Sequence, residues 1–256
     1  MNISESVAIV TGGAGGLGEA VVRRLHAAGA HVVVADLAEE KAHSLAEELG
    51  ERVVYSATDV TDEDSVAATI ALANGLGHLR AAVIAHGGWG VVEKVVGRDG
   101  SPASLSGFTK TLDLYLTGTY NVLRLVAAQM ATLDPDGTGE RGAVVATASI
   151  AGYEGQIGQT AYAAAKAGVI GLTIAAARDL SSVGVRFNTI APGTMRTPTM
   201  ESVGEEAIAK FAANVPFPKR LGEPDEFADT AMFLLQNGYA NGEVIRLDGA
   251  QRFGPR

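Results

Sequence analysis

The stretch Thr11–Gly18, TGGAGGLG, places five glycines within seven residues, between an apolar run at 7–10 and an amphipathic run at 17–28. Glycine lets a chain turn tightly, and it lets a pyrophosphate approach the backbone where a helix begins and its free N–H groups attract anions. A merely flexible turn is the alternative, but it would not need so many glycines. We therefore interpret Gly12, Gly16, Leu17 and Gly18 as a phosphate-binding loop.

Short apolar runs alternate with amphipathic segments on both sides of this loop. Continuous apolar runs between helices are typical of parallel strands buried on both faces. The sequence therefore predicts an α/β fold, a Rossmann-type doubly wound parallel sheet of about seven strands, in a single domain spanning 1–256. We expect strands at 7–10, 31–36, 52–57, 80–85, 142–148, 185–190 and 243–247, and helices at 17–28, 38–49, 105–131, 160–180 and 224–236, with a further helix beginning near 61.

Two longer segments, 87–104 and 193–222, interrupt this alternation. Both follow strands at the C-terminal edge of the sheet, where such folds bind ligands. We expect residues 194–222 to form a substrate lid that includes an amphipathic helix at 203–213. Met195 and Phe211 of the lid either line a substrate pocket or pack onto the core, and Gln156 and Gln159 are expected at the edge of the substrate cleft.

The composition limits which partners the chain is expected to bind and in which cellular compartment it is expected to work. The chain has no cysteine, which excludes disulfides and thiolate metal sites and is compatible with a cytoplasmic location. Its formal net charge is −9 without any basic run, which argues against nucleic acid or an anionic membrane as the main partner. We also expect no membrane-spanning helix, secretion signal or transit peptide.

Two carboxylates follow predicted strands at the ligand-binding edge. Asp36 ends the second strand, where a carboxylate can accept the ribose hydroxyls of an adenosine and repel a 2′-phosphate, so NAD is expected rather than NADP. The same side chain could cap the helix that follows. Asp59 and Val60, after the third strand, are expected to hold the adenine, although a simple turn explains Asp59 nearly as well.

Three polar side chains converge at the same edge. Tyr162 and Lys166 lie one helical turn apart on one face, and Ser149 ends the fifth strand. An unperturbed phenol titrates near ~10, and we expect the ammonium of Lys166 to lower the pKa of Tyr162 so that it can exchange protons near neutral pH. Ser149 would donate to the substrate oxygen beside Tyr162.

With these motifs in this order, the chain resembles the short-chain dehydrogenase/reductase family over nearly its whole length. The pattern T-G-x-x-x-G-x-G matches at 11–18, and Y-x-x-x-K matches at 162–166. The resemblance implies a single bound nicotinamide cofactor and no metal. It adds cofactor contacts at Ala85, Gly87, Pro192, Gly193, Thr194 and Thr197 to those from the glycine loop, Tyr162 and Lys166.

The stretches 147–173, 215–229 and 241–252, together with an insertion at 87–104, narrow the resemblance to the NAD-linked 3-hydroxyacyl-CoA dehydrogenases of that family. This subgroup implies the interconversion of a secondary alcohol and a ketone, an acyl-CoA as the small-molecule substrate, and a place in fatty acid metabolism. It also implies a homotetramer with the C-terminal strand at one interface.

Two positions depart from the family pattern. Ile84-Ala85-His86-Gly87 stands where the family has N-N-A-G, and we interpret His86 as structural, since a lone histidine has no second metal ligand at suitable spacing. Tyr115 stands where the family has an asparagine that links through a water to the catalytic lysine. Tyr115 is therefore a fourth candidate catalytic residue, whose hydroxyl either replaces part of that relay or leaves proton transfer impaired.

Other functions remain open at this stage. A reductase of 3-oxoacyl groups on acyl carrier protein is one, but Asp36 argues against it because biosynthetic reduction generally uses NADPH. A steroid or other secondary-alcohol dehydrogenase is another. A nucleotide-binding scaffold with little turnover would explain the departures at Tyr115 and His86, but the intact Ser149, Tyr162 and Lys166 argue against it.

Overall fold

The central feature of the structure, a computed structural model that describes residues 1–87 and 90–255, is a parallel sheet. Within these residues the sheet has seven strands in the order β3-β2-β1-β4-β5-β6-β7, as the doubly wound prediction requires. Residues 88 and 89 of the predicted 87–104 insertion lie outside the described part. The strands are β1 Val7–Thr11, β2 His31–Asp36, β3 Val53–Ala57, β4 Leu79–Ile84, β5 Gly142–Thr147, β6 Val185–Pro192 and β7 Val244–Leu247.

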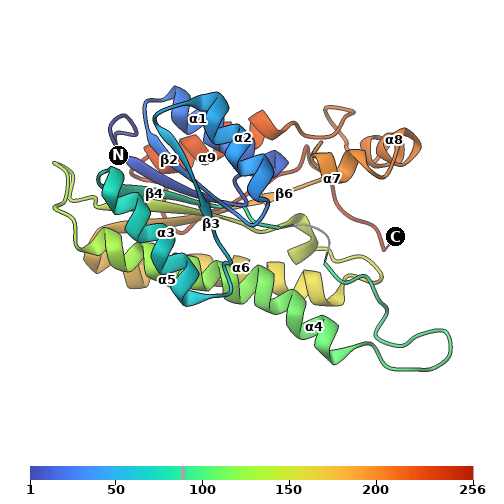
Figure 1. Ribbon diagram of the computed structural model, residues 1–256. Coiled ribbons are helices and arrows are strands. Elements are labelled where there is room, and N and C mark those ends of the chain that lie inside the picture. Colours follow the sequence, from blue (N-terminus) through green and yellow to red (C-terminus); the bar gives the residue numbers. More distant parts are fainter. Residues whose placement is uncertain (88–89, 256) are drawn as a thin grey trace.

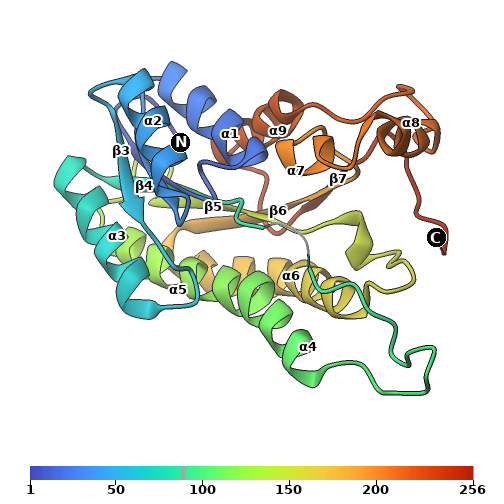
Figure 2. The same cartoon turned by 45° about the vertical axis from the view of Figure 1, so that its right-hand side comes forward.

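Helices cover both faces of the sheet (Figures 1 and 2). One face carries α1 Gly16–Ala27, α2 Glu39–Leu49 and α9 Pro224–Gln236, and the other carries α3 Glu63–Leu76, α4 Leu105–Leu112, α5 Gly118–Ala131 and α6 Thr160–Asp179. Along β1, Ala8 and Val10 face the first layer while Val7 and Ile9 face the second. Strand order reverses between β1 and β4, so the carboxyl ends of these two strands mark the expected ligand site.

The long helix predicted at 105–131 is interrupted. Between α4 and α5 the chain makes a π-helical turn, η1, at Asp113–Thr117. Tyr115 lies at the centre of this turn and is 2% exposed. Because π turns inside α-helices are uncommon and concentrate at functional sites, this irregularity directs attention to Tyr115.

The segment predicted as a substrate lid follows β6 and contains two short helices. These are α7 Pro198–Glu201 and α8 Glu205–Ala213, and α8 corresponds to the predicted helix at 203–213. Gly204 precedes α8 with φ of +87°, a left-handed conformation that glycine adopts without strain, so the helix begins after it. In Figure 2 both helices lie beside the C-terminal ends of β6 and β7.

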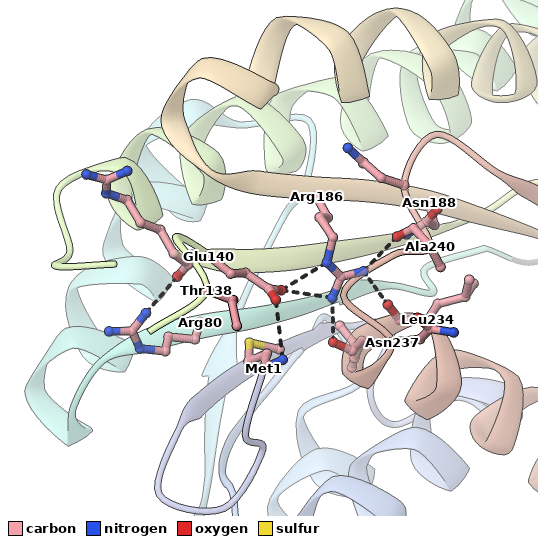
Figure 3. Close-up of polar contacts among 12 residues, drawn as sticks. Met1, Arg80, Thr138, Glu140, Arg186, Asn188, Leu234, Asn237 and Ala240 are labelled. Atoms are coloured by element: carbon pink, nitrogen blue, oxygen red, sulfur yellow. Dashed lines mark hydrogen bonds and ion pairs between the residues drawn. The ribbon is translucent and has the colours of Figure 1, made fainter. Parts of the chain in front are cut away.

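A buried ion pair joins Arg186 of β6 to Glu140, which precedes β5 (Figure 3). Arg186 of β6 donates to Glu140 Oε1 at 2.8 and 3.0 Å, and both side chains are 8% exposed. The same guanidinium donates to the carbonyls of Leu234, Leu235 and Ala240, where α9 ends. The Met1 amino group lies 3.3 Å from the other oxygen of Glu140. These contacts satisfy a charge that would otherwise be costly to bury.

One helical stretch of the described residues, Thr160–Val183, is long and apolar enough to cross a membrane by length and composition alone, although no membrane-spanning helix is expected from the sequence. It consists of α6 and the 3₁₀ turn η3 Leu180–Val183, and it packs against β6. Only 33% of its most apolar window is buried within the chain. Of the remaining residues, Ile170, Leu172 and Ala176 are partly buried against the core.

Candidate active site

Two positions of the glycine loop, Gly12 and Gly18, leave no space for a Cβ. Gly12 has φ of +65°, and a Cβ there would lie 2.5 Å from the His86 Cα atom. A Cβ on Gly18 would collide with the carbonyl oxygen of Gly12. The loop leads into α1, whose N-cap Gly15 offers no side-chain cap. The first-turn N–H groups, which have no acceptor within the helix, are thus left for a ligand.

The start of the lid packs directly on this loop. A Cβ on Gly16 would lie 2.8 Å from the Pro198 Cδ atom and 3.1 Å from the Thr197 Cβ atom. Thr197 also caps α7, since its hydroxyl accepts from the N–H of Met200 at 3.3 Å. The segment predicted as a substrate lid therefore contacts the glycine loop through Thr197 and Pro198.

Asp36 does not cap α2, whose N-cap residue is Ala38, so of the two roles that the sequence left open only the contact with the ribose remains as a prediction. It lies at the end of β2 on the wall of the cavity, where the adenosine ribose is expected. Its Oδ1 accepts from the N–H of Ala38 at 2.9 Å, and its Oδ2 accepts from the N–H of Ala14 at 3.0 Å. Asp36 thus ties the glycine loop to the segment after β2, and its influence on cofactor choice stays a prediction.

Asp59 and Val60 reach the same wall from β3. Asp59 Oδ1 accepts from the backbone N–H and the hydroxyl of Thr61, at 2.9 and 2.7 Å, and these bonds lower the pKa of the carboxyl. The simple-turn interpretation therefore holds for this oxygen. Val60 is buried, and its carbonyl accepts from Asn121 Nδ2 at 2.9 Å.

A cavity of about 630 Å³ connects all of the predicted site residues. It runs from the glycine loop and Asp36, past the switch point, to the lid and the start of α6. Every residue predicted from the sequence lines it: Gly12, Gly16, Leu17, Gly18, Asp36, Asp59, Val60, Ala85, Gly87, Tyr115, Ser149, Gln156, Gln159, Tyr162, Lys166, Pro192, Gly193, Thr194, Met195, Thr197 and Phe211.

Ser149, Tyr162 and Lys166 meet at the middle of this cavity. The Ser149 side chain accepts from the N–H of Ala151 at 3.1 Å, and it lies close enough to the Tyr162 phenol to act on the pKa of that group. Lys166 Nζ donates to the carbonyl of Thr147 at 2.7 Å and lies 5.8 Å from the centre of the Tyr162 ring. The end of β5 and the first turns of α6 thus hold a hydroxyl, a phenol and an ammonium together.

The protonation equilibria of this group differ from the sequence prediction. Burial raises the pKa of Tyr162, and Ser149 only partly opposes this. Burial also lowers the pKa of Lys166 to about 7. The expectation that Lys166 lowers the pKa of Tyr162 is therefore wrong in direction for this structure, because both groups lose hydration and the desolvation of the phenolate dominates.

The two departures from the family pattern come together behind this group. His86 Nδ1 lies 2.9 Å from the Thr11 hydroxyl, and Nε2 lies 3.1 Å from the carbonyl oxygen of Leu114. His86 is therefore a structural bridge between β1 and the π turn, as interpreted from the sequence. The ring of Tyr115 lies beside both Lys166 and Tyr162, but its buried hydroxyl has no hydrogen-bond partner among the described residues.

Sequence reasoning missed the contribution of the C-terminal segment. Phe253 lines the cavity, and the carbonyls of Gly254 and Pro255 accept from Gln156 Nε2 and the N–H of Ile157, at 3.4 and 3.0 Å. Gln251 accepts from the N–H of Thr194 at 3.1 Å. A phenylalanine in an otherwise polar tail was the one available signal.

The fold and the site define a class of protein. A doubly wound sheet with a glycine loop at its switch point and a Ser-Tyr-Lys group in the same cavity is the arrangement of a nicotinamide-dependent oxidoreductase. A family model described as enoyl-(acyl carrier protein) reductase matches residues 12–250. The chain belongs to the short-chain dehydrogenase/reductase family. The predicted family, fold class and oxidoreductase function are thereby confirmed.

Its relatives are similar over almost their full length. The chain is 44% identical over 251 residues to 3-hydroxyacyl-CoA dehydrogenase type-2 of Homo sapiens, with 97% of this chain and 96% of that protein covered. It is 42% identical over 254 residues to the enzyme of the same name from Drosophila melanogaster, with 99% and 100% covered. The crystal structure of 3-hydroxyacyl-CoA dehydrogenase type-2 from Mycobacterium avium matches with a TM-score of 0.97 and 73% identity, over 98% of each chain.

Proposed function

We propose that this chain is an NAD-dependent 3-hydroxyacyl-CoA dehydrogenase that interconverts 3-hydroxyacyl-CoA and 3-oxoacyl-CoA. The observation that carries the proposal is the meeting of Ser149, Tyr162 and Lys166 in a cavity that continues to the glycine loop and Asp36. The names of the similar enzymes support the acyl-CoA as the substrate.

The residues of the cavity fit a dinucleotide. The glycine cradle leaves no space for a Cβ at Gly12 or Gly18, and the uncapped N-terminus of α1 suits a pyrophosphate. Asp36 would accept from the ribose hydroxyls, and its charge would repel a 2′-phosphate, which favours NAD over NADP. Ala85, Gly87 and the Pro192–Thr197 segment would hold the nicotinamide half. A bound nicotinamide supplies the hydride acceptor for alcohol oxidation and the hydride donor for ketone reduction.

The side chains of this chain handle the proton. In the oxidation, the Tyr162 phenolate accepts the proton of the substrate hydroxyl, and in the reduction the Tyr162 phenol returns it to the forming alkoxide. Ser149 donates to the same substrate oxygen and so aligns it with Tyr162. Burial raises the pKa of Tyr162, and the Lys166 ammonium, where it is protonated, offsets only part of the cost of forming the phenolate that the oxidation requires.

An apolar acyl chain suits the other end of the cavity. Met195, Met200 and Phe211 of the lid face it together with Phe253 of the tail, and Gln156 and Gln159 mark its edge. At the rim, Lys94 and Arg98 are exposed and available to the phosphates of a CoA group. Lys210 and Arg220 are less available, since each is paired with a glutamate, Glu206 and Glu226, at 2.8 Å.

We also propose a cytoplasmic homotetramer. The apolar outer face of α6 and the outer edge of β7, which ends the strand order, support subunit contacts. Tyr239 is fully exposed and Phe233 is 50% exposed, and both residues precede β7 in the chain. The lack of cysteine supports a reducing compartment.

The substrate proposal is tested by comparing three ketones with the same enzyme. The oxidation of NADH is followed at 340 nm with acetoacetyl-CoA, with acetoacetyl-acyl carrier protein and with a 17-ketosteroid. We expect the highest kcat/KM with acetoacetyl-CoA. A higher kcat/KM with the carrier-protein substrate would instead make this chain a biosynthetic reductase, and binding of NADH without turnover of any ketone would indicate a nucleotide-binding scaffold.

A further inference from the structure

The ring of Tyr115 is seated against the lysine of the catalytic group. Lys166 Nζ lies 5.0 Å from the centre of the Tyr115 ring, closer than the 5.8 Å to the centre of the Tyr162 ring. The two rings meet edge to face, with centroids 5.3 Å apart and an interplanar angle of 88°. Tyr115 and Lys166 are 2% and 3% exposed, so water does not compete for the ammonium. A desolvated ammonium over an aromatic face is attracted to it.

The hydroxyl of Tyr115 takes no part in this contact. It is buried and has no hydrogen-bond partner among the described residues, although a buried hydroxyl normally finds one. Because solvent does not reach it, it does not serve as an open donor to a ligand. The ring is therefore the part of Tyr115 that acts on Lys166. Burying the hydroxyl without a partner costs free energy of folding.

His86 holds the Tyr115 ring in place through the backbone. The carbonyl of Leu114, next to Tyr115 in the π turn, can only accept, so His86 Nε2 carries the proton and donates to it. His86 Nδ1 then accepts from the Thr11 hydroxyl. Burial and the charge of Lys166 lower the pKa of His86 to about 4, which keeps this neutral tautomer at physiological pH. A protonated His86 would lose its bond from Thr11.

We propose that His86 and Tyr115 form one positioning unit, in which His86 fixes the π turn and the Tyr115 ring stabilises the ammonium of Lys166. The unit explains why both departures from the family pattern occur in this chain, because each is connected to the other through Leu114. The inference rests on the proposed acid–base role of Tyr162 and Lys166. In this positioning unit, the face of the Tyr115 ring takes the place of the hydrogen-bonded relay that the family has at the lysine.

The groups around Lys166 make its titration observable. Tyr162 faces it from its own helix, Tyr115 from the π turn, and His86 from the end of β4, while the Thr147 carbonyl of β5 accepts from it. His86 is neutral above pH ~5, and the pKa of Tyr162 is raised above its ordinary value of 10. A loss of activity near neutral pH in the reduction therefore reports the deprotonation of Lys166.

The test is the pH profile of kcat/KM for ketone reduction in Tyr115→Leu and Tyr115→Phe. Removing the ring in Tyr115→Leu should move the alkaline limb to lower pH by about one unit, since the ammonium loses a desolvated aromatic contact. Tyr115→Phe keeps the ring and should leave the midpoint in place. Tyr120→Leu, the same change on an exposed tyrosine of α5, is the matched control and should not move the midpoint.

His86→Ala gives a second and independent readout. His86→Ala should move the alkaline limb of the kcat/KM profile to lower pH, as Tyr115→Leu does. The double variant His86→Ala/Tyr115→Leu should shift this limb no further than Tyr115→Leu alone, because His86 acts through Tyr115. If Tyr115→Leu does not fold, the other two variants decide: the midpoint should move in His86→Ala and stay in place in Tyr115→Phe, and an unmoved midpoint in His86→Ala would overturn the inference.

Two results would overturn the inference. One is an unmoved midpoint in Tyr115→Leu, and the other is an equal shift in Tyr115→Phe, which would assign the effect to the hydroxyl. Failure of the underlying acid–base proposal has a different signature, because Tyr162→Phe would then keep its turnover.

Discussion

Replacing Lys166 with methionine removes a buried titratable group while keeping a side chain of similar length. Lys166 is 3% exposed, and burial lowers its pKa from 10.5 to about 7. Between these two values the unfolded chain holds a proton that the folded chain has released. Unfolding therefore takes up protons, and the stability of the wild-type protein rises with pH across this window.

The size of the effect follows from the two pKa values. One unit corresponds to about 1.36 kcal/mol, and the half-titration of Lys166 at pH 7 reduces the change over the first unit. From pH 7 to pH 9 the wild-type protein should gain about 2 kcal/mol relative to Lys166→Met. Comparing the two proteins at each pH cancels every other titrating group, as well as the lost hydrogen bond to the Thr147 carbonyl.

The assay is urea unfolding followed by circular dichroism at pH 7, 8 and 9, at one protein concentration because assembly affects apparent stability. The expected result is a free-energy difference between the two proteins that changes steadily in favour of the wild type as pH rises. A difference that stays constant would show that Lys166 keeps an ordinary pKa, and the account of a desolvated lysine would be wrong.

Three further predictions concern the loop, the cofactor and the buried ion pair. Gly18→Ala should abolish NADH binding in a fluorescence titration, because the added Cβ collides with the Gly12 carbonyl. Asp36→Asn should raise the ratio of kcat/KM with NADPH to that with NADH at least about tenfold, because the charge that repels a 2′-phosphate is gone. Glu140→Gln should lower the free energy of unfolding by about 3 kcal/mol, because Arg186 keeps its charge and loses its buried counter-ion.

Each of these changes has a control or a result that would contradict it. Gly75→Ala, at an exposed helical position with nothing within 4 Å of the new Cβ, should leave NADH binding intact. Glu206→Gln, in an exposed pair with Lys210, should change stability by less than about 0.5 kcal/mol. An unchanged cofactor ratio in Asp36→Asn would remove the carboxylate from the explanation of cofactor choice.

The sheet and the cavity could be predicted because their signals are local. The strand predicted at 31–36 is β2 His31–Asp36, and the helix predicted at 224–236 is α9 Pro224–Gln236. Parallel strands bring their carboxyl ends to one edge, so residues far apart in sequence, such as Asp36 and Ser149, were expected in one place. The cavity indeed joins them.

The remaining features depend on contacts that no local pattern encodes. The π turn at Asp113–Thr117 coincides with a hydrogen bond from His86 to Leu114, and the apolar spacing of 105–131 fits an uninterrupted helix equally well. Phe253 reaches the cavity through backbone bonds of the tail to residues near 156. The direction of the Tyr162 pKa shift depends on burial, which the spacing of Tyr162 and Lys166 does not reveal.

The central claim is that Tyr162 transfers the proton in an NADH-dependent reduction of a 3-oxoacyl-CoA. The most direct measurement is NADH oxidation with acetoacetyl-CoA by the wild-type enzyme and by Tyr162→Phe, together with NADH binding to both. The account predicts that both proteins bind NADH, that the wild type turns over with NADH in preference to NADPH, and that Tyr162→Phe loses at least about a hundredfold in kcat. Turnover by Tyr162→Phe within tenfold of the wild type would contradict it.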